Sequence, residues 1–167
     1  MTTTKFLRVV RLDQSDTQIY ELAAEAGEWA IPGTFYFWDV DPDALSGKSR
    51  QAFVHGFLGL TSFGWATLVT VAEIDAQELS AAIRRLAGHL VERFGAPDIV
   101  TAMPAAREEI DFAVGLCNQD LDTLIAIQRT YQADEITENF KIVRPASGVD
   151  HSRIKLFGLD DSYDAEG

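Results

Sequence analysis

The sequence contains a single cysteine, Cys117, so it cannot form a disulfide within the chain. This scarcity fits a reducing compartment, and we expect a cytoplasmic protein. The sequence also lacks a run of about 20 apolar residues, which a membrane-spanning helix needs. Its first residues, MTTTKFLRVVRLD, lack the apolar segment and the cleavage pattern of a signal peptide. Together these absences predict a globular protein with no membrane partner.

Basic residues are scarce as well. The chain has 14 lysines and arginines against 26 aspartates and glutamates, and its net charge is −12. Such a field repels a nucleic-acid backbone unless the basic side chains gather on one face. No basic cluster in the sequence is large enough for that, so we expect no nucleic-acid partner. Part of the acid excess lies in residues 160–167, which we expect to form a flexible acidic C-terminal tail.

The clearest structural pattern is a strand followed by a capped helix. Residues 63–74, FGWATLVTVAEI, combine β-branched and aromatic residues over the length of a strand. Asp75 and Glu78 then have the spacing of a helix cap. The apolar stripe of the helix recurs every three or four residues: Leu79, Ile83, Leu86, Leu90 and Phe94. Gly95 and Pro97 predict where this helix ends.

Shorter patterns indicate the other elements. Strands are predicted at residues 5–12, 17–23 (with a helix as the alternative), 34–39, 124–131, 136–143 and 153–159, and helices at residues 49–57 and from Pro104 onward. Residues 27–32 are expected to form a loop. Strands that are adjacent in sequence at both ends of the chain favour an α+β fold, with an antiparallel or mixed sheet of about six to seven strands packed against two or three helices. Residues 1–159 are predicted to form a single domain, because this length suits one core.

Three aspartates at alternate positions, Asp39, Asp41 and Asp43, raise the question of a metal-dependent function. A calcium loop would need glycine where Ala44 stands and glutamate where Arg50 stands. The segment FYFWDVDPD also resembles the phosphotransferase motif of haloacid-dehalogenase-type enzymes, in which Asp39 would be the nucleophile and Asp41 the acid–base partner. However, Asp43 replaces the usual Thr or Val, and no matching lysine-bearing segment follows. We therefore favour an acidic turn that caps a helix.

The other motifs that suggest chemistry are incomplete. The triplet Gly-Lys-Ser at 47–49 resembles the end of a phosphate-binding loop, but Pro42 replaces its first glycine. The histidines are too widely spaced for a zinc site: His55, His89 and His151. Cys117 lies on an apolar helical stripe with Ile110 and Ala113, so we predict a buried core thiol. We expect no metal and no cofactor, and we consider an enzyme the less favoured interpretation.

One positive hypothesis for a site remains. Trp38, Arg50, His55 and Trp65 are predicted to converge at one end of the sheet and to line a pocket there. Aromatic residues at strand spacing more often fill a core than a binding site, so this pocket competes with a purely structural interpretation.

Three segments carry a resemblance to known proteins. KFLRVVRLDQSDTQIYE, GEWAIPGTFYFWD and GFLGLTSFGWATLV resemble the sequences of a family of uncharacterised bacterial proteins of unknown function. The resemblance extends to about Pro145, and its glycine-aromatic segment is the most specific part. It implies no activity, cofactor or catalytic residue. It does imply an accessory or assembly role, because members of the family are encoded near accessory genes of redox-enzyme systems.

The leading hypothesis is therefore a non-enzymatic cytoplasmic accessory or protein-interaction domain that forms a homodimer. A free sheet edge at the first or last strand would supply the pairing surface. One alternative is a small-molecule-binding protein or enzyme that uses the four-residue pocket. The other is a metal-dependent phosphohydrolase that uses the paired aspartates.

Overall fold

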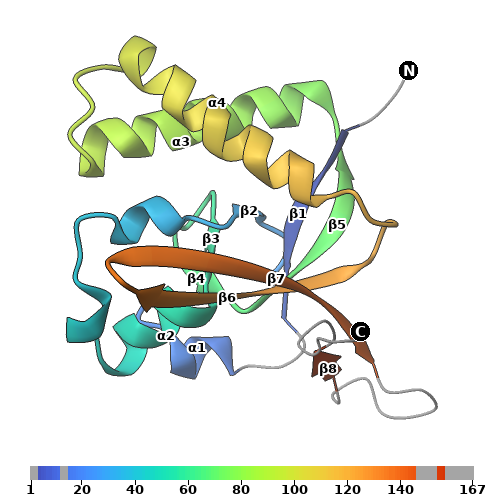
Figure 1. Cartoon of the computed structure of the whole chain (residues 1–167). Coiled ribbons are helices and arrows are strands. Elements are labelled where there is room, and N and C mark those ends of the chain that lie inside the picture. Colours follow the sequence, from blue (N-terminus) through green and yellow to red (C-terminus); the bar gives the residue numbers. More distant parts are fainter. Residues whose placement is uncertain (1–3, 12–14, 146–153, 157–167) are drawn as a thin grey trace.

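The computed structural model describes residues 4–11, 15–145 and 154–156 (Figure 1). Its centre is an eight-stranded sheet in the order β4-β3-β2-β1-β5-β6-β7-β8, in which all neighbouring strands run antiparallel. The strands are β1 (Thr4–Val10), β2 (Trp29–Ile31), β3 (Phe57–Gly59), β4 (Trp65–Ala66), β5 (Leu68–Ile74), β6 (Leu124–Gln132), β7 (Glu135–Pro145) and β8 (Ile154–Leu156). The helices are α1 (Asp16–Ile19), α2 (Gly47–His55), α3 (Ala76–Arg93) and α4 (Ile99–Leu116), with the short 3-10 helices η1 (Thr34–Phe37) and η2 (Pro42–Ala44). The predicted α+β fold is confirmed.

Helices cover both faces of the sheet. Figure 1 shows α3 and α4 on one side and α1 and α2 on the other. Phe6 and Leu7 are neighbours on the central strand β1, and both are fully buried. Because successive side chains of a strand point to opposite faces, their burial shows that both faces of β1 are covered. None of the helices in the described part of the chain has the length and apolar character that crossing a bilayer requires.

The capped helix α3 follows its local sequence closely. Asp75 accepts a hydrogen bond from the backbone N–H of Glu78 at 2.8 Å, as the cap predicts. Gly95 follows the last turn with φ of 79°, in the left-handed region that glycine adopts most readily. Ile83, Leu86 and Leu90 of the predicted stripe are buried in the core, whereas Phe94 at its end is partly exposed.

The hairpin of β6 and β7 is also confirmed, with register from Leu124–Val143 to Gln132–Glu135. Ala133 and Asp134 connect the strands, and both have positive φ (53° and 64°). This is the backbone geometry of a two-residue turn that matches the twist of its strands. The predicted last strand is represented by β8. Its remaining residues, the acidic tail at 160–167 and His151 lie outside the described residues.

Several predicted elements were wrong. Residues 34–39 form η1 and the turn after it, not a strand, and the neighbouring β2 was expected to be a loop. The reason is that Pro32 cannot continue the ladder and Gly33 turns the chain with φ of 76°. The aromatic residues of η1 then pack on helices: the ring of Phe37 lies 5.2 Å from that of Phe53 on α2.

Three boundaries also differ from the prediction. Helix α4 begins at Ile99, because Asp98 caps it by accepting from the N–H of Thr101 at 2.7 Å. Pro104 therefore lies inside the helix rather than at its start. The predicted strand at 63–74 is divided into β4 and β5. Of residues 17–23, residues 17–19 belong to the four-residue helix α1, in line with the helix alternative, and no strand forms there. The Cys117 thiol is buried as predicted, and burial raises its pKa to about 12.

The glycine-aromatic segment fills space rather than enclosing it. The buried carboxylate of Glu28 accepts hydrogen bonds from the N–H groups of Thr61 (2.9 Å) and Ser62 (2.8 Å) and from the Ser62 hydroxyl (2.7 Å). A Cβ atom on Gly59 would lie 2.5 Å from this carboxylate, and one on Gly64 would lie 2.7 Å from the backbone of Ala23. Gly59 is therefore needed for close packing against Glu28, and Gly64 for the close approach to the backbone of residues 22–24.

Candidate functional site

The structure does not bring the four predicted pocket residues into one cavity. Trp38 follows η1 and lines a pocket together with α4 and β7. His55 ends α2 and lines a different pocket with residues of β5, β6 and β7. Arg50 is exposed on α2, and its guanidinium donates to the carbonyl of Pro42 at 3.4 Å.

Trp65 belongs to the packed interior between these places. Its ring lies 5.2 Å from the ring of Tyr36 and 5.4 Å from that of Phe37. A Cβ atom on Gly56 would lie 2.7 Å from the same indole ring. Trp65 is thus enclosed by its neighbours and acts as a packing residue in this structure.

The aspartates of the phosphotransferase-like motif form an acidic turn, as favoured above. The carboxylate of Asp41 accepts from the N–H of Asp43 at 3.0 Å and caps η2. The segment before Asp39 is a 3-10 helix, so the apolar strand that such enzymes place before this motif is not formed. Within the described ranges, no three His, Cys, Asp or Glu side chains are grouped to hold a metal ion.

A more distinctive group of residues surrounds Trp38. A cavity of about 300 Å³ lies between η1, α4 and β7. Its lining combines aromatic rings with two carboxylates: Pro32, Thr34, Phe35, Trp38, Glu109, Phe112, Ile136 and Glu138. We call this cavity the acidic–aromatic pocket. Its three walls come from distant parts of the sequence.

Two aromatic side chains at the pocket are unusually accessible. Trp38 is 68% exposed and Phe112 is 47% exposed. Each is supported by an inner ring: Phe35 lies 6.3 Å from Trp38, and Phe140 lies 6.1 Å from Phe112. Trp38 and Phe112 lie at the same cavity, and tryptophan is prominent among the residues that dominate binding energies.

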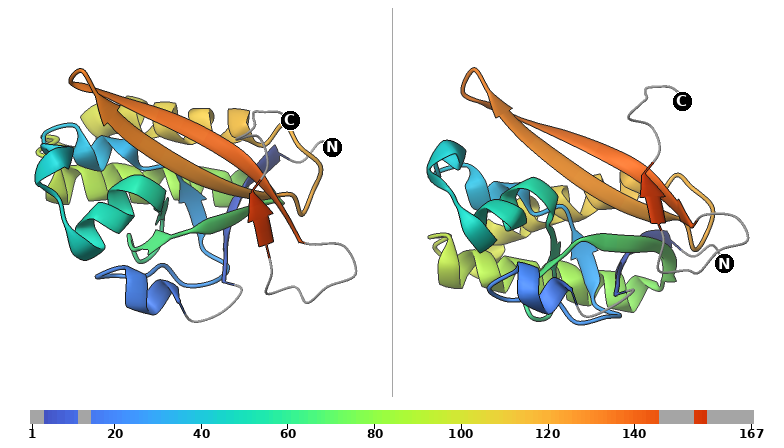
Figure 2. Two further views of the ribbon diagram at one scale, coloured as in Figure 1. Left: turned by 60° about the horizontal axis from the view of Figure 1, so that its bottom comes forward. Right: turned by 90° about the horizontal axis from the view of Figure 1, so that it is seen from below.

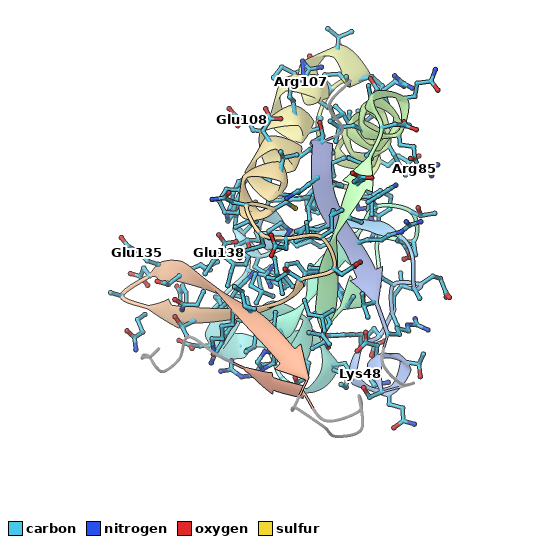
Figure 3. All side chains as sticks on the ribbon, turned by 90° about the vertical axis from the view of Figure 1, so that its right-hand side faces the viewer. Lys48, Arg85, Arg107, Glu108, Glu135 and Glu138 are labelled. Atoms are coloured by element: carbon cyan, nitrogen blue, oxygen red, sulfur yellow. The ribbon has the colours of Figure 1, made fainter. Side chains whose placement is uncertain are left out.

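The two carboxylates face the same pocket from different elements. Burial raises the pKa of Glu109 on α4 to about 6, and the negative charges of Glu138 and Glu108 add to the effect. Figure 3 shows Glu108 on α4 and Glu138 on β7 on the same side of the molecule. A ligand with a positive charge would relieve this repulsion, since an opposite charge favours the ionised carboxylate.

A buried arginine supports the pocket from the interior. Arg129 on β6 is 1% exposed. Its guanidinium donates to the carbonyls of Phe53 (2.7 Å), Ala52 (3.2 Å) and Pro32, and to the hydroxyl of Thr34 (2.7 Å). Burial lowers its pKa to about 10, so Arg129 stays charged at neutral pH. The arginine thereby ties α2 to the turn that carries η1.

Thr34 links this arginine to the pocket. Its hydroxyl accepts from Arg129 and donates to the carboxylate of Glu138. The negative charge of Glu138 opposes the lowering of the Arg129 pKa. The position of Glu138 in the pocket is therefore fixed by a hydrogen-bonded chain that begins in the core.

Four residues of this site were not predicted from the sequence: Glu109, Phe112, Arg129 and Glu138. One signal was available for Arg129: it lies two residues after Ile127 and four after Ile125, which places all three on the same face of a strand. Because both isoleucines are buried, the arginine had to be buried with them. No comparable signal exists for the pocket, since nothing local in the sequence brings η1, α4 and β7 together.

The raised pKa of Glu109 makes a prediction about stability. A carboxyl whose pKa is higher in the folded state favours folding below its ordinary pKa near 4.5, and this contribution is lost as pH rises through about 6. Glu109→Gln should therefore raise the free energy of unfolding at pH 7.5 by about 1 kcal/mol, after allowance for solvent screening. At pH 4 the two proteins should be equally stable in urea denaturation. The control is Glu92→Gln, which changes an exposed glutamate of α3 and should not raise the free energy of unfolding at pH 7.5. Equal stability of Glu109→Gln and the wild type at pH 7.5 would contradict the electrostatic interpretation.

No curated protein and no solved structure matches the chain. A family model described as "Family of unknown function (DUF6505)" matches residues 3–158. This match covers most of the chain and agrees with the resemblance found in its glycine-aromatic and N-terminal segments. The chain therefore belongs to this family of unknown function.

Proposed function

We propose that this chain is a protein-interaction domain that binds a positively charged segment of a partner protein at the acidic–aromatic pocket. The observation that carries the proposal is the exposure of Trp38, 68%, beside the two carboxylates of Glu109 and Glu138. An exposed indole ring and a pair of carboxylates both attract a lysine or arginine side chain, the first through cation–π attraction and the second through charge.

The surroundings of the pocket support a positively charged partner. Desolvation, together with the charges of Asp134, Asp41 and Asp43, raises the pKa of Tyr131 near the tip of the hairpin. These acids thus add to the negative field beside the pocket. With a net charge of −12, the chain attracts basic partners and repels acidic ones.

The electrostatic environment of the pocket favours a role in binding over a role in stabilising the fold. Glu109 is partly buried against like charges, which opposes folding at neutral pH, while Thr34 and Arg129 hold Glu138 in place. Groups that are kept in an unfavourable electrostatic environment are frequently found at functional sites.

Titration calorimetry with a synthetic peptide tests this proposal. The probe is a peptide that alternates lysine with valine and is long enough to span residues 135–142. Trp38→Ala should weaken its affinity by about tenfold, because an aromatic anchor of this kind contributes on the order of 1.4 kcal/mol. Leu22→Ala, which removes another exposed apolar side chain away from the pocket, should leave the affinity unchanged.

Charge gives the second arm of the test. Affinity for the lysine peptide should fall as salt is raised, because exposed charges are screened. A matched peptide with glutamate in place of lysine should not bind. Equal binding of both peptides, or an unchanged affinity in Trp38→Ala, would rule the proposal out. Homodimer formation stays a prediction, and light scattering on the protein without peptide measures it directly.

A further inference from the structure

We propose that the partner segment binds as an extended strand along the outer edge of β7, with a basic side chain placed over the acidic–aromatic pocket. This inference rests on the proposed function and specifies how the partner is recognised. Strand addition supplies affinity through backbone hydrogen bonds and specificity through alternate side chains.

The edge itself is long. Strand β6 pairs with β7 along one side, from Glu135 to Val143. On the other side β8 pairs only with Val143, Arg144 and Pro145. Ile136, Glu138, Phe140 and Ile142 therefore have a strand neighbour on one side only among the described parts of the chain. Figure 2 shows the turn of the β6–β7 hairpin extending beyond the helices.

The pairing pattern identifies the backbone groups at this edge. In an antiparallel ladder, residues that exchange hydrogen bonds with one neighbour alternate with residues whose N–H and C=O point the other way. Gln132 and Glu135 close the two-residue turn and form a hydrogen-bonded pair in such hairpins. Counting from that pair, the outward-pointing backbone groups belong to Ile136, Glu138, Phe140 and Ile142.

The half of this set nearest the hairpin turn faces the pocket. Ile136 and Glu138 belong to its lining, and the ring of Phe140 lies 6.1 Å from that of Phe112 on α4. Residues directly opposite each other in an antiparallel pair have their side chains on the same face. A lysine or arginine opposite Glu138 would therefore lie on the pocket side, between the carboxylates of Glu138 and Glu109.

Charge favours a basic partner over a second copy of the chain. Figure 3 shows Glu135 and Glu138 of β7 on the same side as Glu108 of α4. Two copies joined at β7 would bring two sets of these acids together, each on a chain with a net charge of −12. A basic strand instead neutralises them, since opposite charges across a strand pair are stabilising and like charges are destabilising.

Amide hydrogen exchange followed by NMR tests this geometry in the full-length protein. Adding the lysine–valine peptide should slow exchange at Ile136, Glu138, Phe140 and Ile142 by about tenfold or more. The amides of Thr137 and Asn139 point toward β6 and serve as internal controls, because they should be protected with or without peptide. A peptide methylated on alternate backbone nitrogens keeps its charge but cannot pair as a strand, so it should bind at least tenfold more weakly.

The outcomes separate this inference from the proposed function. If the peptide binds and is weakened by Trp38→Ala but leaves the four amides unprotected, the pocket binds the segment without strand addition, and the inference is wrong. If these amides are already protected before peptide is added, the edge is occupied by another part of the chain or by a second copy, and the inference is again wrong. If the peptide does not bind at all, the proposed function itself fails.

Discussion

Replacing Arg129 with alanine should lower the free energy of unfolding by about 3–5 kcal/mol, the largest effect that we expect from a single substitution. The guanidinium donates to the carbonyls of Pro32, Ala52 and Phe53. The Ala52 carbonyl also accepts from the N–H of Gly56 at 3.0 Å, whereas the carbonyls of Pro32 and Phe53 would lose the donor that Arg129 supplies. The variant would also leave a cavity and remove the charge that faces Glu138. Arg129→Lys should recover only part of the loss, because an ammonium cannot reproduce the planar fork of donors.

Urea denaturation at pH 7 measures this effect. Arg84→Ala, which removes an exposed arginine from α3, is the matched control and should change stability by no more than about 0.5 kcal/mol. A loss below about 1 kcal/mol in Arg129→Ala would mean that water satisfies the freed carbonyls, and that Arg129 does not anchor the walls of the pocket.

Replacing Glu28 with alanine should lower the free energy of unfolding by about 3 kcal/mol at pH 7. The carboxylate is buried and accepts hydrogen bonds from Glu25, Thr61 and Ser62, and its removal leaves backbone N–H groups in the loop without an acceptor. Glu21→Ala, an exposed glutamate nearby in sequence, is the control and should be close to neutral.

The stability that Glu28 contributes should depend on pH. Burial alone would raise the pKa of Glu28, but the hydrogen bonds from Ser62, Glu25 and Thr61 together lower it below its ordinary value. A carboxyl with a lowered folded-state pKa contributes fully above the unfolded value, near 4.5, and loses this contribution as pH falls through the folded value. The difference in free energy of unfolding between the wild type and Glu28→Ala should therefore be constant from pH 7 to about 5 and become smaller below about 4. If this difference in free energy of unfolding is unchanged at strongly acidic pH, the account is wrong.

The helices and strands that can be predicted well from the sequence are those whose signals lie within one short stretch of the chain. Helix α3 has its cap at Asp75, its apolar stripe and its stop at Gly95 within a single stretch, and the structure places all three as expected. The β6–β7 hairpin is equally local, because one turn sets its register. The fold class followed from these elements and from their order.

The candidate site depends instead on contacts between residues far apart in sequence. Thr34 and Glu138 are joined by a hydrogen bond across 104 residues, and Arg129 reaches Pro32 across 97. The residues 34–39 have strand-like composition, yet the turn at Gly33 directs them into η1 and leaves Trp38 at the surface. The composition of this segment does not show whether its aromatic residues pack in a strand or lie exposed at the surface, because tertiary context decides between the two.

The position of β1 in the sheet has a consequence for how the chain assembles. Strand β1 is synthesised before β5 and pairs with it along its whole length, from Thr4–Ile74 to Val10–Leu68. Closing a loop of this length is entropically slow compared with forming a hairpin or a helix. During synthesis, β1 therefore stays without its longest strand partner in the sheet until Ile74 has been added, and the buried side chains Phe6, Leu7 and Val9 cannot complete their packing before then.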